Sequence, residues 1–137
     1  MKSVAEKMGI KESMISFIVD APPDALDRIQ LPAIKRKRSL TGEFDYIHLF
    51  VKTQAKFRVK FPALKKHLKA TGSLWVSWPK SGQIETDLTL PVVIKLGYDA
   101  GLVESKTLSV DSVWSAIKFT HPKAGKKYNN SYGKLPV

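Results

Sequence analysis

Short blocks of hydrophobic residues alternate with polar segments along this 137-residue chain. Blocks rich in apolar and β-branched residues, bounded by polar residues or turns, predict buried strands. Such blocks lie at 14–19, 45–51 and 73–78, and more polar ones lie at 34–40, 103–110 and 113–120. Because 45–51 is apolar on both faces, we expect it in the centre of a parallel sheet, whereas the charged block 34–40 fits an edge.

Helices are predicted between these strands. Ser3 and Glu6 have the spacing of a capping box and predict a helix over 3–8. Pro23 and Pro91 suit the first turn of two further helices, since proline is accepted there, and Gly101 is expected to end the second.

A fourth helix is predicted over 54–69, with Gly72 following its end. Proline inside a helix removes a hydrogen bond, so Pro62 predicts a kink or a split. The alternation over 57–61 also fits a strand. The helical interpretation rests on four apolar residues that share one helix face, namely Phe57, Phe61, Leu64 and Leu68.

The resulting order, β-α-β-β-α-β-α-β-β, predicts a single three-layer α/β domain over residues 1–122. Right-handed crossovers give a mostly parallel sheet of about six strands with helices on both faces. The short turn at 111–112 makes the last strand antiparallel to its neighbour. Residues 123–137, with several glycines, asparagines and lysines, are predicted to form a basic, poorly ordered tail.

Composition excludes several classes of function. The chain has no cysteine, which excludes a disulfide scaffold, a zinc–thiolate site and a cysteine nucleophile. The N-terminus lacks the apolar core of a signal peptide, and no apolar run is long enough to cross a bilayer. We therefore expect a cytoplasmic protein with no membrane partner.

Charge adds a possible partner class. The chain carries 23 Lys and Arg against 12 Asp and Glu, and residues 52–69 hold seven basic residues and no acidic one. Such a surface attracts polyanions, including nucleic acid, although it also fits a solubilising face with no specific partner. The candidate polyanion-binding residues are Lys35, Arg36, Lys37, Arg38, Lys65, Lys66 and Lys69. Nucleic-acid binding of this type also needs aromatic residues interleaved with the charges. Phe57 and Phe61 are the only candidates, and we expect both in the core.

A candidate ligand crevice follows from the strand that ends in Trp78-Pro79-Lys80. Ligands of parallel α/β sheets bind at the carboxyl ends of the strands. The candidates at those ends and in the adjoining loop are Asp20, Lys52, Thr53, Trp78, Lys80, Glu85, Asp87 and Trp114. We expect Trp114 to approach Trp78, and a tryptophan wall beside lysine and carboxylates suits a planar or anionic ligand. The alternative places Trp75 and Trp114 in the core and makes Asp87 a helix cap.

No catalytic or metal-binding motif is present. His48 lies within an apolar strand, where a hydrogen-bonded core histidine or a general base are the two interpretations. His67 and His121 lack the spacing of metal ligands, and Ser77 lacks the flanking glycines of a serine hydrolase. The sequence therefore predicts no catalytic residue and no metal site.

Three segments resemble S-adenosylmethionine-dependent methyltransferases and their Rossmann-like fold: 44–50 resembles the fourth strand of that fold, 64–76 the helix and strand that follow it, and 96–103 a late helix-to-strand junction. The chain is also similar to a family of small bacterial proteins of unknown function, through 45–50, 74–80 with 85–88, and 100–103 with 110–115. That family implies no activity.

The chain departs from the methyltransferase pattern at two positions. Asp20-Ala21-Pro22-Pro23 stands where the resemblance implies a glycine-rich turn, and two prolines remove backbone N–H donors. The second strand ends in basic residues instead of the acidic residue that binds ribose. We therefore expect no cofactor, and a non-catalytic domain that binds a partner or small ligand at the crevice. The alternatives are a small divergent S-adenosylmethionine-dependent enzyme, with Asp20 or Asp87 as base and Lys80 orienting an anion, and a nucleic-acid-binding protein.

Overall fold

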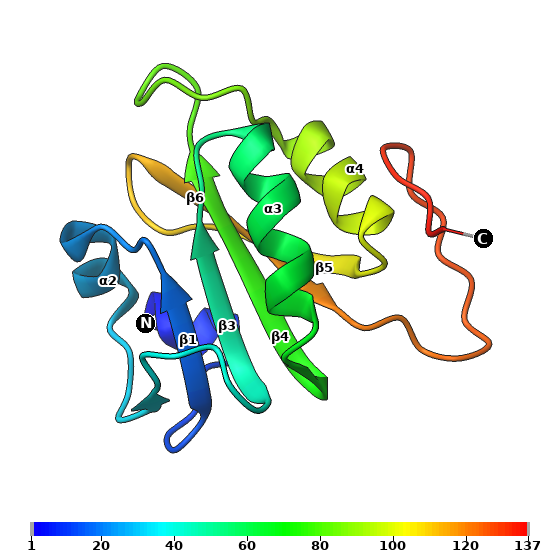
Figure 1. Cartoon of the computed structure of the whole chain (residues 1–137). Coiled ribbons are helices and arrows are strands. Elements are labelled where there is room, and N and C mark those ends of the chain that lie inside the picture. The colour runs from blue at the N-terminus through cyan, green and yellow to red at the C-terminus, as the bar shows by residue number, and fades with distance from the viewer. Residues whose placement is uncertain (1, 137) are drawn as a thin grey trace.

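The computed structural model describes residues 2–136, and its centre is one six-stranded sheet (Figure 1). The strands lie in the order β2-β1-β3-β4-β6-β5, and β6 is antiparallel to both of its neighbours while the other pairings are parallel. The elements are α1 Val4–Met8, β1 Ile15–Val19, α2 Pro23–Ile29, β2 Lys35–Arg36, β3 Phe44–Phe50, α3 Gln54–Lys65, β4 Leu68–Pro79, α4 Leu90–Asp99, β5 Val103–Ser109 and β6 Trp114–Thr120. The predicted fold class, element order and antiparallel strand are confirmed.

Helices cover both faces of the sheet. Helices α3 and α4 pack on the face that points to the viewer in Figure 1, where Phe57 and Phe61 meet Val93 and Phe119 in one apolar cluster. Helices α1 and α2 cover the opposite face, around a second cluster that contains Tyr46, Trp75 and Trp114. Alternate residues of β3 and β4 enter the two clusters, because successive side chains of a strand point to opposite faces.

The second strand is much shorter than the sequence predicted. Only Lys35 and Arg36 pair with β1, so the strand predicted over 34–40 is wrong beyond them. Residues 35–39 are exposed, and their charged side chains have no apolar face to bury against a neighbouring layer.

Helix α3 runs without interruption from Gln54 to Lys65, so Pro62 does not split it and the alternative strand over 57–61 is wrong. The stabilisation from burying Phe57, Phe61 and Leu64 on one face outweighs the hydrogen bond that proline removes. Pro62 itself lies on the exposed side of the helix.

Strand β4 begins at Leu68, so the helix ends earlier than predicted and Gly72 lies inside the strand. A Cβ at Gly72 would come within 2.8 Å of the Phe44 carbonyl oxygen. The pairing of β3 with β4 shifts register at this point. Gly72 therefore permits a close backbone approach, which is a common reason for glycine within a strand.

The segment after β6 contains no helix or strand among the described residues. Tyr128 and Leu135 pack against the cluster under α3 and α4, and the Asn130 amide donates a hydrogen bond to Glu104. The poor order expected from its composition stays a prediction. None of the described helices has the length and apolarity needed to cross a bilayer.

Candidate ligand site at the carboxyl edge of the sheet

The chain reverses its direction of winding between β1 and β3. From β1 it passes through α2 to β2 on one side, and from β3 it passes through α3 to β4 on the other. Such a switch point leaves a crevice outside the carboxyl ends of the two strands. A cavity of about 420 Å³ lies there, which we call the switch-point cavity. Its lining residues are Asp20, Pro22, Phe50, Val51, Lys52, Thr53, Lys56, Ile84 and Trp114.

The cavity combines an aromatic floor with a charged rim. The rings of Phe50 and Trp114 are both buried and meet edge to face, with centroids 5.4 Å apart. Lys52 and Lys56 are exposed and take part in no ion pair within residues 2–136, and Asp20 is the only acidic residue of the lining. The site therefore offers apolar ring surface beside two free ammonium groups.

Asp20 occupies a backbone conformation that usually favours glycine. Its φ is +56°, in the left-handed region, directly after β1. Pro22 then caps helix α2 with its backbone alone, and Pro23 is the first helical residue. The turn is thus made by an aspartate that tolerates positive φ and by two prolines that offer no N–H group to a ligand.

Asp87 does not line the switch-point cavity but holds the loop before α4 against the start of α3. Its Oδ1 accepts a hydrogen bond of 2.8 Å from the backbone N–H of Gln54, and the Gln54 amide donates to the Asp87 carbonyl at 2.9 Å. The Thr86 hydroxyl donates to the Lys52 carbonyl at 2.7 Å. Thr53 is the N-cap residue of α3, and Asp87 adds to that cap by accepting from the first N–H of the helix from a distant loop.

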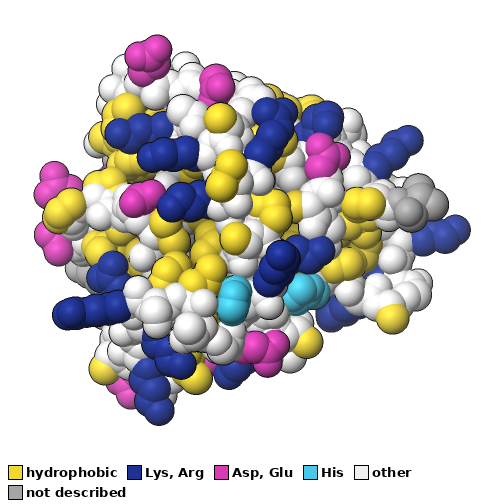
Figure 2. Space-filling view, viewed as in Figure 1, with side chains coloured by type: hydrophobic (Ala, Val, Ile, Leu, Met, Phe, Trp, Pro, Cys, Tyr) yellow, Lys and Arg dark blue, Asp and Glu magenta, His cyan; other side chains and the backbone are white. Residues whose placement is uncertain are grey.

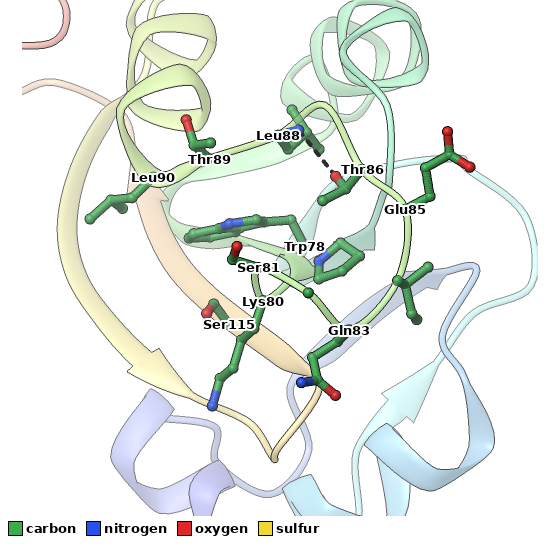
Figure 3. A pocket seen from close by; sticks show the side chains of 13 residues that line it. Trp78, Lys80, Ser81, Gln83, Glu85, Thr86, Leu88, Thr89, Leu90 and Ser115 are labelled. Atoms are coloured by element: carbon green, nitrogen blue, oxygen red, sulfur yellow. Dashed lines mark hydrogen bonds between the residues drawn. The ribbon is translucent and has the colours of Figure 1, made fainter.

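The remaining crevice candidates surround a second hollow of about 640 Å³, walled by Trp78 and the loop that follows β4 (Figure 3). Figure 3 shows the Lys80 side chain directed away from the Trp78 ring, and its Nζ lies 2.6 Å from Ser109 Oγ. Glu85 also points away from the ring. Neither charge is therefore aimed into this hollow.

The expectation that Trp114 approaches Trp78 is wrong. In the register of β4 with β6, Trp114 pairs with Pro79 and Trp78 pairs with Ser115. The two tryptophans consequently enter clusters on opposite faces of the sheet. The structure brings Asp20, Lys52, Thr53 and Trp114 together and leaves Trp78, Lys80 and Glu85 in the other hollow.

A buried polar chain crosses the strands behind the cavity. Tyr46 Oη lies 2.6 Å from His48 Nδ1, and His48 Nε2 lies 2.7 Å from Ser77 Oγ. All three residues are inaccessible to solvent. Burial lowers the pKa of His48 to about 3 and raises the pKa of Tyr46, so both side chains are neutral at physiological pH. A neutral histidine with both nitrogens occupied and no access to substrate fits the core interpretation better than a general base.

The polyanion candidates fall into two groups. Lys35, Arg36, Lys37 and Arg38 are exposed along the β2 edge. In the other group two cations are engaged internally, since Lys65 Nζ donates to the Ala100 carbonyl at 2.8 Å and Lys69 Nζ pairs with Asp45 at 3.0 Å. Lys66 is exposed.

Lys56 and Phe50 line the switch-point cavity but were missed by the sequence analysis. Lys56 could have been identified from its place in the first turn of the helix that follows β3. Phe50 could have been identified as the last residue of that strand. Both follow from the same rule that selected Lys52 and Thr53.

Solved structures similar to this fold include S-adenosylmethionine-dependent methyltransferases. A TehB-like enzyme of Corynebacterium glutamicum aligns with a TM-score of 0.57 and 12% identity over 89% of each chain. A 1,6-didemethyltoxoflavin-N1-methyltransferase of Burkholderia thailandensis aligns with a TM-score of 0.59 and 11% identity over 88% of this chain and 75% of the other. A magnesium protoporphyrin IX methyltransferase of Synechocystis aligns at 0.54 and 8%, over 87% and 78%.

At these identities the likeness shows the fold alone, and the fold is methyltransferase-like. No model of a known protein family matches the sequence, and no curated protein matches it. Among residues 2–136, no three histidine or acidic side chains gather in a way that would hold a metal ion.

The segments that follow β1 and form β2 do not fit S-adenosylmethionine. The turn after β1 contains Pro22 and Pro23, which lack the N–H groups that a Rossmann-like turn offers to its ligand. Strand β2 ends at Arg36, which pairs with Ser16 near the amino end of β1, so β2 brings no acidic residue to the carboxyl edge to accept hydrogen bonds from ribose hydroxyls.

Proposed function

We propose that this protein is a non-catalytic, methyltransferase-like domain that binds a small planar anion in the switch-point cavity. One observation carries the proposal. A cavity with an aromatic floor and two free lysines lies at the switch point of the fold, while the residues around it are ill suited to S-adenosylmethionine.

The chemistry of the lining supports a planar anion. A volume of about 420 Å³ is in the usual range for sites that bind small organic molecules. Phe50, Trp114 and Ile84 offer apolar surface to a ring. Lys52 and Lys56 offer two positive charges, against the single negative charge of Asp20, so a carboxylate or phosphate on that ring is favoured over a cation.

Titration of the isotopically labelled chain by NMR tests the proposal. The probes are AMP, which is planar and anionic, adenosine, which is planar and neutral, and inorganic phosphate, which has no ring. We expect AMP to shift the Trp114 indole and Lys56 amide signals at millimolar concentration, with weaker effects of the other two. S-adenosylmethionine and S-adenosylhomocysteine should bind no better than adenosine.

Matched variants locate the site. Lys52→Gln with Lys56→Gln should weaken AMP binding roughly fivefold or more, as the loss of about 1 kcal/mol of exposed charge interaction does. Lys80→Gln, which removes a cation outside the cavity, should leave the affinity unchanged. Absence of AMP-dependent shifts would overturn the proposal, and tight binding of S-adenosylmethionine would favour the small divergent enzyme instead.

A further inference from the structure

The outward face of α3 carries an unusual concentration of positive charge. Arg58 and Lys60 of the helix and Lys66 at its C-cap are exposed, and we call these three cations the α3 basic strip. Lys56 is also exposed, but it lines the switch-point cavity and is not counted in the strip. Phe57, Phe61 and Leu64 hold the opposite face of the helix in the core. No acidic residue occurs anywhere between Asp45 and Glu85 in the sequence.

The charges of this strip are not neutralised within the protein. The ion pairs among residues 2–136 are Lys69 with Asp45 and Lys95 with Asp99, and neither involves the strip. The contact of Arg58 is a long hydrogen bond of 3.4 Å to Gln54. In Figure 2, which views the molecule from the α3 and α4 side, Lys and Arg side chains outnumber Asp and Glu on the visible face.

The structure therefore moves the candidate polyanion surface. The sequence predicted it at Lys65 and Lys69, together with Lys66 and the β2 edge. Lys65 and Lys69 are committed to the Ala100 carbonyl and the Asp45 carboxylate. Outside the switch-point cavity, the free charge of the helix lies on Arg58 and Lys60, which the sequence had not singled out.

The shape of the strip suits a phosphate backbone. A helix of 12 residues is about 18 Å long, and duplex DNA carries one negative charge per ~1.7 Å of its axis. Arg58 and Lys60 flank Val59, whose side chain is 73% exposed, so cations project on both sides of the outermost ridge. Single-strand binders stack bases on exposed aromatic rings, and the rings of this helix are buried.

We infer that the α3 basic strip is a docking surface for the phosphate backbone of duplex nucleic acid, bound without sequence preference. The complement is electrostatic, since exposed cations that form no ion pair among residues 2–136 meet the charges of the phosphates. The surface is separate from the proposed ligand function, because Arg58, Lys60 and Lys66 do not line the switch-point cavity.

The test is fluorescence anisotropy of a labelled, mixed-sequence DNA duplex titrated with the full chain at a series of salt concentrations. Two triple variants each remove three positive charges. One is Arg58→Gln, Lys60→Gln and Lys66→Gln on the strip, and the matched control is Lys35→Gln, Arg36→Gln and Arg38→Gln on the β2 edge. Thermal unfolding of each variant confirms that it is folded.

We expect the unmodified chain to bind the duplex with an affinity that falls linearly with salt on logarithmic axes. Loss of three phosphate contacts should reduce the magnitude of that slope by roughly 2.7 in the strip variant. The control should keep the slope and the affinity of the unmodified chain. A duplex of scrambled sequence should bind equally well.

Several results would overturn the inference. Absence of binding at low salt would do so, as would equal losses in both variants, which would indicate net charge alone. Tighter binding of the single strand than of the duplex would contradict the backbone-only contact. Binding of polyglutamate but not of the duplex would assign the strip to an acidic protein. The AMP titration is unaffected by any of these outcomes.

Discussion

His48 and Ser77 lie on the neighbouring strands β3 and β4, and their side chains share a hydrogen bond of 2.7 Å inside the protein. Tyr46 occupies the other nitrogen of the imidazole at 2.6 Å, and the imidazole stacks on Phe50 with centroids 4.3 Å apart. Phe50 in turn forms the floor of the switch-point cavity. The polar chain therefore supports the cavity from behind.

Protonation of His48 should destabilise the fold in acid. Its folded-state pKa is about 3, and the unfolded value is about 6.5. Between these values the unfolded chain binds a proton that the native chain does not. The free energy of unfolding is thus highest above pH ~6.5 and falls as pH decreases, by up to about 1.4 kcal/mol per pH unit from this residue. Urea unfolding across this pH range measures the slope.

His48→Phe should reduce that slope, whereas His67→Gln should keep it because His48 remains. If the slope is the same in the unmodified chain and in His48→Phe, His48 is not the group responsible.

Substitutions of Tyr46, His48 and Ser77 should have strongly non-additive effects on the free energy of unfolding. His48→Phe alone leaves the Tyr46 hydroxyl and the Ser77 hydroxyl buried without a partner, at a cost of about 1–3 kcal/mol for each. Adding Tyr46→Phe and Ser77→Ala removes those unpaired groups, so the triple variant should be more stable than His48→Phe. Urea unfolding of the single and triple variants measures the difference. A triple variant as unstable as the sum of three single losses would contradict the network.

Asp45 should stabilise the start of the sheet only while it is ionised. Burial raises the pKa of Asp45. The hydrogen bond from the Ile15 N–H and the interactions with Lys69 lower it by a larger amount, so the net shift is downward. Its contribution is therefore present above the unfolded pKa of about 3.9 and is lost as pH falls below it.

Asp45→Asn should lower the free energy of unfolding by about 1 kcal/mol at neutral pH. The difference from the unmodified chain should vanish at a pH where the Asp45 carboxylate of the native state is protonated. Lys69→Gln, which keeps the bond from Ile15, should cost less. Chemical unfolding at neutral and acid pH separates these effects. An Asp45→Asn deficit that persists unchanged in acid would rule out a role of the charge.

Gly97→Ala should destabilise the contact between α4 and β6. A Cβ at Gly97 would overlap the ring of Phe119, which is fully buried. Overpacking of this kind costs about 1–3 kcal/mol. Phe119→Leu in the Gly97→Ala background should recover part of the loss, and thermal unfolding of the four chains completes the double-mutant cycle. Additive losses would show that the two residues are not in contact.

Asp20 should tolerate only residues that accept positive φ. Asp20→Asn keeps a side chain that visits the left-handed region and should leave stability nearly unchanged. Asp20→Val places a β-branched residue there and should cost about 1–2 kcal/mol. Thermal unfolding compares the two variants. Equal stability would mean that the turn can relax out of this conformation.

The element order followed from the sequence because it depends on local patterns. The apolar block that contains His48 and Leu49 predicted a central strand, and Pro91 predicted the start of a helix. Right-handed connections then left few arrangements, and a parallel sheet ending in an antiparallel pair was the one found. Where burial and local preference disagreed, at Pro62 and Gly72, the prediction failed.

The candidate site was predictable only as a list of residues at one edge of the sheet. The register of β4 with β6 sent Trp78 and Trp114 to opposite faces, and a shift of one residue would have reversed that result. The contact of Asp87 with Gln54 joins segments 33 residues apart, which no local pattern reports.

The sequence by itself determined the order of helices and strands, the fold class and the excess of positive charge, since each depends on residue type and near neighbours. Only the tertiary structure decided which charges are free, because the partners of Lys65 and Lys69 come from distant strands and turns. It also decided where the cavity lies, because long-range packing brings Asp20, Lys56 and Trp114 around one volume.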